Sequence, residues 1–125
     1  MKEANTLIPI AMPSIGEEEA RAAYDTVKSG WISMGRKVRD FESLCCDYTG
    51  AKHAVAMNNG TATLHALLMA LDIRPGDEIV IPSLTYISSI NVVLYVGAKP
   101  VLCDSDHQTF NVTPSHVREK ITNHT

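Results

Sequence analysis

Hydrophobic positions recur at helical spacing in two stretches of the first fifty residues. Ser14 and Glu17 form a capping-box pattern, which predicts that a first helix begins here, and Gly30 is expected to end it. Gly50 is expected to end a second helix in the same way. The recurring apolar residues are Ala20, Ala23, Tyr24 and Val27 in the first helix, and Val38, Phe41, Leu44, Cys45 and Tyr48 in the second. This spacing predicts two amphipathic helices.

Short apolar runs predict strands in the rest of the chain, at residues 53–57, 79–81 and 101–103. The second and third runs contain no polar residue, which is typical of strands in a parallel sheet that is covered on both faces. Helical patterns separate the runs, so strands and helices alternate along the chain. This alternation predicts an α/β fold, with a layered and largely parallel sheet flanked by helices.

Further helices are predicted between and after these strands. One follows Gly60 and is apolar on most of its sides, which predicts burial on more than one face. Another covers residues 86–96 and separates the last two strands. Thr113 and Pro114 predict the start of a last helix, because threonine is a good cap and proline is favoured at the first helical position.

Composition narrows the classes of partner. Hydrophobic residues make up 45% of the chain and charged residues 20%, as in an ordinary folded domain. The formal net charge of −3 offers no basic footprint for nucleic acid or for an anionic membrane. The sequence contains no apolar run long enough to span a bilayer. We therefore expect neither nucleic acid nor a membrane as a partner.

The cysteines point to a reducing compartment. Cys45, Cys46 and Cys103 are odd in number, and their spacing matches neither a disulfide framework nor a zinc site. Reduced cytoplasmic thiols are the expected state, and the N-terminus shows no signal-peptide pattern. Asp104 and Asp106 follow a predicted strand, but two carboxylates without further ligands favour a solvated loop, so no metal site is predicted.

A candidate anion site lies where the strand at 53–57 meets the following helix. Asn59 and Gly60 form a tight turn, and Thr61 and Ala62 begin the helix, so several backbone N–H groups and the positive end of the helix dipole converge. A phosphate is a common ligand of such a point. A plain strand–turn–helix junction, in which Asn59 and Gly60 serve only the turn, is the alternative.

Two aromatic residues have alternative roles as well. Tyr86 follows the strand at 79–81, where its ring would either stack on a planar cofactor or lie in the core or at a helix cap. Trp31 lies in a loop between two helices, with glycines at both ends of the loop. From the residues alone, the loop is a simple interhelical turn whose tryptophan fills the core.

Four motifs follow one another in order: Asn-Gly-Thr-Ala at 59–62, Pro-Gly-Asp-Glu at 75–78, Pro-Ser-Leu-Thr-Tyr at 82–86 and Gly-Ala-Lys-Pro-Val at 97–101. In this arrangement the chain resembles the pyridoxal-phosphate-dependent nucleotide-sugar aminotransferases of the fold type I superfamily. The resemblance runs from about Ile8 to the last residue. It implies that residues 1–125 are an N-terminal, incomplete portion of the large domain, and that pyridoxal 5′-phosphate is the cofactor.

The resemblance also assigns roles to residues. It implies that Thr61 and Ala62 hold the cofactor phosphate by their backbone amides, with Asn59 and Gly60 in the same turn, and that Tyr86 stacks on the cofactor ring. The family usually carries serine where Asn59 stands, which leaves the side-chain contact at Asn59 open. The loop residues that the resemblance places beside the sugar-nucleotide pocket are Trp31, Ser33 and Met34.

The implied reaction is a transamination of a nucleotide-linked keto-deoxysugar, with an amino acid as donor. Residues 85–91 and 104–106 most resemble perosamine synthases, which implies GDP-4-keto-6-deoxymannose as substrate, glutamate as donor and polysaccharide or O-antigen synthesis as the pathway. The resemblance also implies a homodimer. None of the lysines stands at the position of the Schiff-base lysine, so no catalytic residue is assigned and this segment alone is expected to be inactive.

Several readings of the function remain open. The chain is either part of an active aminotransferase or a truncated, non-catalytic segment that binds phosphate or the cofactor. A dehydratase of the same family is also compatible with these residues, because the residue that distinguishes it lies in a later part of the family members. An unrelated nucleotide-binding domain is disfavoured, since the sequence has neither a Gly-x-Gly-x-x-Gly motif nor a P-loop.

Overall fold

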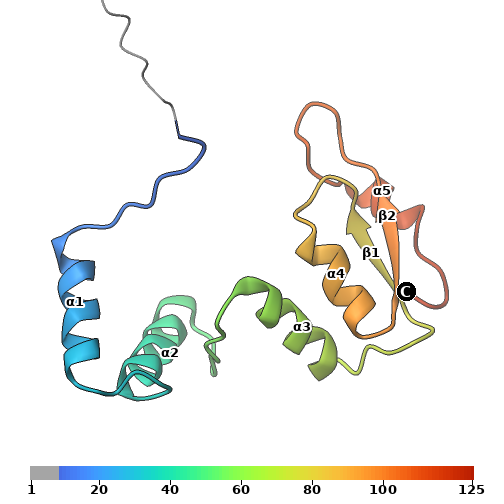
Figure 1. The fold of residues 1–125 in the computed structure, drawn as a ribbon. Coiled ribbons are helices and arrows are strands. Elements are labelled where there is room, and N and C mark those ends of the chain that lie inside the picture. Colours follow the sequence, from blue (N-terminus) through green and yellow to red (C-terminus); the bar gives the residue numbers. More distant parts are fainter. Residues whose placement is uncertain (1–8) are drawn as a thin grey trace, which may run out of the picture. The chain divides into compact units, whose positions relative to one another are not determined.

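The structure is a computed structural model, and it describes residues 9–125. Residues 1–8, which the sequence assigns to the same N-terminal portion, lie outside this part. The chain divides into two compact units, with the boundary between Ala56 and Met57 (Figure 1). We call the part before this boundary the first unit and residues 57–125 the second unit, and describe each by itself.

The first unit contains two helices, α1 (Glu17–Lys28) and α2 (Arg36–Thr49). The prediction that Ser14 and Glu17 cap the first helix is wrong, because Gly16 is the N-cap. A glutamate side chain still reaches back, since the backbone N–H of Gly16 donates to Glu19 at 2.7 Å. Glutamates at positions 17, 18 and 19 all suit the positive end of the helix, so the helix begins later than expected.

The end of α2 follows the prediction. Gly50 is its C-cap and has a left-handed conformation with φ of 73°, which glycine adopts without strain. No residue of α1 or α2 is buried. The apolar face of α2 is open to solvent, with Phe41 57%, Leu44 66% and Tyr48 94% exposed. The periodicity therefore locates the helices, but their apolar faces have no cover within the described residues.

The strand predicted at residues 53–57 is not formed. The chain is irregular there, and the backbone N–H of Ala56 donates to the carboxylate of Glu42 on α2 at 2.9 Å. A strand exists only where a second strand accepts and donates its backbone hydrogen bonds. Here a side chain takes the donor instead, so the apolar run alone did not determine the structure.

The second unit is built on a parallel pair of strands, β1 (Glu78–Pro82) and β2 (Lys99–Cys103), as predicted. The helix between them, α4 (Ser88–Tyr95), packs on both strands. Its buried residues Val92 and Val93 form the core together with Ile81 and Ala98. The strand–helix–strand order thus gives a small layered α/β unit (Figure 1).

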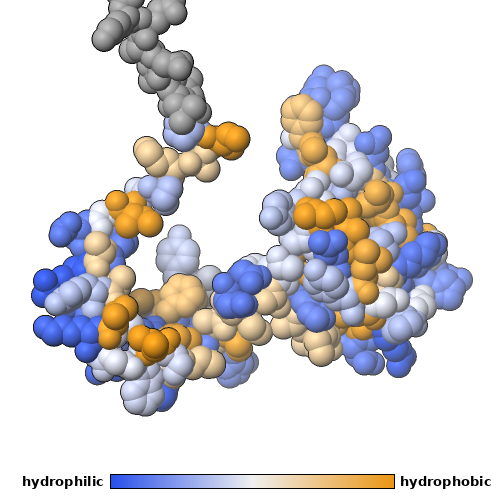
Figure 2. All heavy atoms as spheres, viewed as in Figure 1, coloured by the Kyte–Doolittle hydropathy of each residue, from blue (hydrophilic) through white to orange (hydrophobic). Residues whose placement is uncertain are grey.

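The remaining helices are α3 (Gly60–Ala70), which packs against α4, and α5 (Pro114–Arg118). Thr113 caps α5 and Pro114 begins it, as predicted. The prediction that α3 is buried on more than one face is wrong. None of its residues is buried, and Leu67 and Met69 are 53% and 63% exposed. Figure 2 shows hydrophobic side chains at the surface of both units.

The backbone hydrogen bonds fix the register of the strand pair. Glu78 lies opposite Lys99 and Pro82 lies opposite Cys103. The N–H of Lys99 donates to Asp77, and on the other side of β1 the N–H of Glu78 donates to the carbonyl of His124 at 2.8 Å. Side-chain hydrogen bonds from Lys99 and Thr122, each 2.7 Å long, hold the pKa of Glu78 below its ordinary value.

The loop between β2 and α5 is ordered by a single carboxylate. Asp106 Oδ1 accepts from the backbone N–H of Thr109 at 2.8 Å, from the Thr109 hydroxyl at 3.0 Å and from the N–H of Gln108 at 3.1 Å. The bond from the Thr109 backbone, followed by the other two, lowers the pKa of Asp106. No group of three or more metal-binding side chains forms anywhere in residues 9–125.

We expect this loop to loosen in acid. Because the pKa of Asp106 is lowered in the folded state, its stabilisation is complete above the unfolded value of about 3.9 and is lost as the pH falls through the folded pKa. The backbone amide signals of Gln108 and Thr109 should therefore shift in one step below pH ~3.9. Asp106→Asn, which cannot ionise, should remove this step. An unchanged step in that variant would assign the transition to another group.

Candidate functional site

The candidate anion site is the α3 turn, which we define as residues 59–62. Asn59 has an extended backbone and is the N-cap of α3. Its side-chain Oδ1 accepts from the backbone N–H of Ala62 at 2.9 Å, and its carbonyl accepts from the N–H of Thr63 at 3.2 Å. The sequence places a good N-cap residue three positions before Ala62, which is the local reason that α3 begins here.

The α3 turn leaves two donors without a partner. The backbone N–H groups of Gly60 and Thr61 donate to no acceptor in the part of the chain that the structure describes. The space in front of Gly60 is open, since a Cβ built there would meet nothing within 4 Å. Two free donors, open space and the positive end of an eleven-residue helix fit a phosphate group. The N–H of Ala62 is expected to bind phosphate as well, but in the structure it donates to Asn59 Oδ1.

Tyr86 lies in the same unit as the α3 turn, on the segment between β1 and α4. Its side chain is 76% exposed, so the alternative of a core tyrosine is wrong. The segment is held locally, because the carbonyl of Tyr86 accepts from the N–H of Ser89 at 3.0 Å and the hydroxyls of Thr85 and Ser89 lie 3.2 Å apart. An aromatic side chain is therefore open to solvent at the carboxyl end of β1, where ligands collect in α/β folds.

Sequence reasoning did not find Ser105, which follows β2 at the same end of the strand pair. Its hydroxyl oxygen is buried and has no hydrogen-bond partner among residues 9–125. A buried polar group without a partner is unusual and costs free energy unless something satisfies it. Serine is common in loops, so the sequence carried no signal for this.

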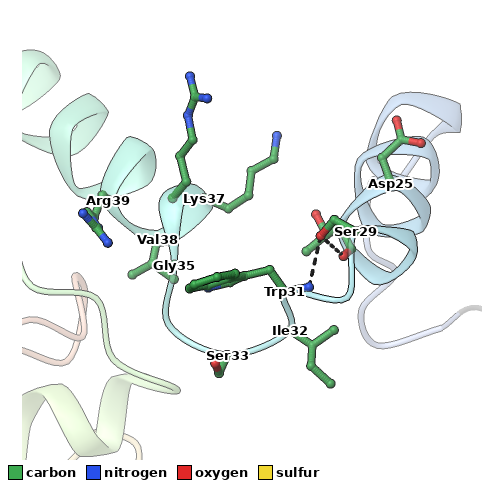
Figure 3. A pocket seen from close by; sticks show the side chains of 11 residues that line it. Asp25, Ser29, Trp31, Ile32, Ser33, Gly35, Lys37, Val38 and Arg39 are labelled. Carbon is green, nitrogen blue, oxygen red and sulfur yellow. Dashed lines mark hydrogen bonds between the residues drawn. The ribbon is translucent and has the colours of Figure 1, made fainter.

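The Trp31 loop, residues 30–35, connects α1 and α2 in the first unit. The indole N–H of Trp31 donates to the carbonyl of Met34 at 3.1 Å. The ring lies against Gly35, as Figure 3 shows, and a Cβ at position 35 would clash with the Nε1 and Cδ1 atoms of the ring. Trp31 is 63% exposed, so the alternative of a core-filling tryptophan is wrong.

A cavity of about 590 Å³ opens beside this ring. Trp31 and Ser33 line it, whereas Met34 does not and contributes its carbonyl to the ring position instead. The cations on α2 that also line the cavity are Arg36, Lys37 and Arg39. The sequence analysis named only residues of the loop itself and did not include these cations of α2. Asp25 of α1 lines the cavity as well, so the cations outnumber the single carboxylate. An aromatic wall with an excess of cations is suited to a ligand that carries both a flat ring and negative charge.

Comparison with known proteins decides the family. The model of the DegT/DnrJ/EryC1/StrS aminotransferase family matches residues 13–125, almost the whole chain. The chain belongs to this family. The matched residues include the strand–helix–strand core, the α3 turn and the Trp31 loop.

Solved structures agree with the assignment. An aminotransferase of Psychrobacter cryohalolentis is 37% identical, with a TM-score of 0.85, and the match covers 90% of this chain and 29% of that protein. Spr1654 of Streptococcus pneumoniae, named as a sugar aminotransferase, is also 37% identical in its pyridoxal-phosphate form, with a TM-score of 0.88 over 94% of this chain and 30% of that protein. A GDP-4-keto-6-deoxymannose-3-dehydratase shares the fold at 24% identity and a TM-score of 0.85.

These matches confirm two predictions. The helices and the parallel strand pair correspond to part of a fold type I aminotransferase. Pyridoxal 5′-phosphate is confirmed as the cofactor of the family, because Spr1654 has been solved in both its pyridoxal-phosphate and its pyridoxamine-phosphate forms. The chain spans about 30% of the length of the proteins it matches. No helix among residues 9–125 has the length and apolar character needed to cross a membrane.

Proposed function

We propose that residues 1–125 are the N-terminal portion of the large domain of a sugar aminotransferase, and that this portion binds the phosphate of pyridoxal 5′-phosphate at the α3 turn. The observation that carries the proposal is the pair of free N–H groups of Gly60 and Thr61 at the start of a helix, in a chain that belongs to this family. Bound cofactor would supply an electron sink for moving an amino group.

In this proposal the residues of this chain bind the cofactor and orient it. Gly60 and Thr61 donate to the phosphate, and the open space at Gly60 lets the phosphate approach the backbone. Tyr86 offers its exposed ring to the flat face of the cofactor. We assign no catalytic residue here, and this segment alone is proposed to be inactive because the Schiff-base lysine is expected elsewhere.

The substrate is proposed to be a nucleotide-linked keto-deoxysugar, with GDP-4-keto-6-deoxymannose as the specific candidate and glutamate as amino donor, in polysaccharide or O-antigen synthesis. The cavity beside Trp31 supports an anionic substrate of this kind, since Arg36, Lys37 and Arg39 line it together with the indole ring. Cations of this type bind phosphate oxygens, and an indole face accepts a flat base. Ser33 would add a hydroxyl from the same loop.

The proposed setting is the cytoplasm, where the free thiols of Cys45, Cys46 and Cys103 would stay reduced. The proposed assembly is a homodimer, supported by the exposed apolar faces of α2 and α3. Nucleic acid and membranes are not proposed as partners, given the net charge of −3. The alternatives are a non-catalytic segment that binds only phosphate or cofactor, and a sugar dehydratase, whose fold this chain shares.

The proposed phosphate site has a direct test. Gly60 is the first residue of α3. Proline is favoured at this helical position, and α5 of the same chain begins with Pro114. Gly60→Pro removes one donor without breaking the helix, whereas Gly60→Ala keeps the donor. In a pyridoxal-phosphate titration followed by NMR, the amides of residues 60–62 should shift, and Gly60→Pro should weaken binding about tenfold or more. Unmoved amides at saturating cofactor would refute the site.

The substrate cavity has a separate test that uses the single tryptophan of the chain. GDP-mannose, a stable stand-in for the keto-sugar, should quench the fluorescence of Trp31, and mannose alone should not. Lys37→Gln should weaken the quenching, and Lys52→Gln is the matched control because Lys52 does not line this cavity. Equal quenching by mannose and by GDP-mannose would refute recognition of the nucleotide.

A further inference from the structure

The side chain of Asn59 occupies a donor that the proposed phosphate site needs. Three N–H groups point out of the first turn of α3, those of Gly60, Thr61 and Ala62, because none has a helical partner four residues earlier. Asn59 Oδ1 accepts from the Ala62 N–H at 2.9 Å, so only two of the three remain free. The occupied donor is one of the two that the family resemblance assigns to the phosphate.

We infer that the carboxamide of Asn59 competes with the cofactor phosphate for the N–H of Ala62, and that phosphate binding displaces it. This inference rests on the proposed cofactor site. The phosphate is the stronger acceptor, since hydrogen bonds to an ionised group are about twice as strong as those between neutral groups. The helix dipole also favours the charged ligand over the neutral carboxamide.

The displaced side chain has room to leave. Asn59 is exposed, and among residues 9–125 its Oδ1 accepts a hydrogen bond only from the N–H of Ala62 in the same turn. The Asn59 backbone would stay in place, because its carbonyl accepts from the N–H and the hydroxyl of Thr63. The exchange is therefore a rotation of one side chain. It keeps the first turn of α3 formed while the site is empty and lowers the affinity for phosphate.

The competition predicts that removing the Asn59 side chain strengthens phosphate binding. Glycine is the suitable replacement, because it is itself an acceptable N-cap and lowers helix stability far less than alanine does. Replacing an asparagine cap with glycine changes the helix equilibrium by about twofold. Asn59→Gly should therefore bind inorganic phosphate and pyridoxal phosphate up to about twofold more tightly than the unmodified chain.

The experiment measures phosphate binding by NMR in three forms of the chain. In the unmodified chain the Ala62 amide and the side-chain NH₂ signals of Asn59 should shift together as inorganic phosphate is added. In Asn59→Gly the Ala62 amide should already be shifted and the dissociation constant should fall. The matched control is Thr113→Gly, which removes the side-chain cap of α5 and should leave phosphate affinity unchanged.

The outcomes separate the inference from the proposed site. Shifts of the Gly60 and Thr61 amides, with an equal or weaker affinity in Asn59→Gly, would overturn the competition and leave the phosphate site intact. Stationary Asn59 NH₂ signals during binding would also overturn it. If neither form responds to phosphate or to pyridoxal phosphate, the proposed site itself fails and the inference falls with it.

Discussion

Replacing Val93 with aspartate should unfold the second unit. Val93 is 1% exposed and lies in the core with Ile81, Val92 and Ala98. A buried carboxylate without a partner costs several kcal/mol, roughly as much as the whole stability of a small unit. Because so few residues are fully buried, no second core would hold the strand pair together. Loss of NMR dispersion for the residues of β1, β2 and α4 would report the unfolding.

Leu94→Asp is the matched control for this prediction. Leu94 is the next residue on the same helix, and its side chain is 55% exposed, so a charge there stays in water. Val93→Ala should give an intermediate effect of about 2 kcal/mol in urea unfolding, from lost apolar burial and the cavity left behind. Similar stabilities for Val93→Asp and Leu94→Asp would show that Val93 is not at the centre of the core.

The isolated chain should self-associate. Large apolar side chains are exposed along two helices, which include Phe41, Leu44 and Tyr48 on α2, and Leu67, Met69 and Leu71 on or just after α3. Exposed apolar surface of this kind marks an interface or an aggregation risk. Analytical ultracentrifugation should show species larger than a monomer that increase with concentration, since the hydrophobic effect favours covering both faces.

A pair of charge substitutions tests which face associates. Met69→Lys combined with Leu71→Lys should shift the chain toward the monomer, because a charge cannot be buried in an apolar contact without a large penalty. Ile121→Lys is the control, since Ile121 is a comparably exposed apolar residue outside both faces. A soluble, folded monomer at high concentration would contradict both the proposed homodimer and the proposal that this chain is part of a larger domain.

Local signals in the sequence predicted the fold where a few neighbouring residues decide it. Gly50 ended α2 and Thr113 with Pro114 began α5, because caps act within one helical turn. The strands at 79–81 and 101–103 were also located, since each has a partner within the chain. The run at 53–57 has no such partner among residues 9–125, and Glu42 satisfies one of its donors instead.

The candidate site divides in the same way. The turn at residues 59–62 could be located because an asparagine cap and a glycine are local features. The same capping rule predicts that Asn59 accepts from the N–H of Ala62, as the structure shows. The family resemblance assigned this N–H to the phosphate instead. Side-chain geometry across a loop was not predictable from the sequence. The packing of the Trp31 ring against Gly35 and the position of the cations beside it are therefore known only from the structure.

The register of β1 and β2 determines which backbone groups the two outer edges of this sheet offer. In a parallel pair, alternate residues of each strand point their backbone groups at the partner. Lys99 and Cys103 bond to β1, so Pro100 lies on the outer side of β2, where it offers no N–H to a neighbour. Proline in that position is typical of an edge strand. Pro82 holds the equivalent place on the outer side of β1, because the N–H of the next residue, Ser83, donates to Cys103 on β2, and the outward N–H of Glu78 is occupied by His124. Each outer edge of the pair therefore contains one proline and offers few free N–H groups to a further strand.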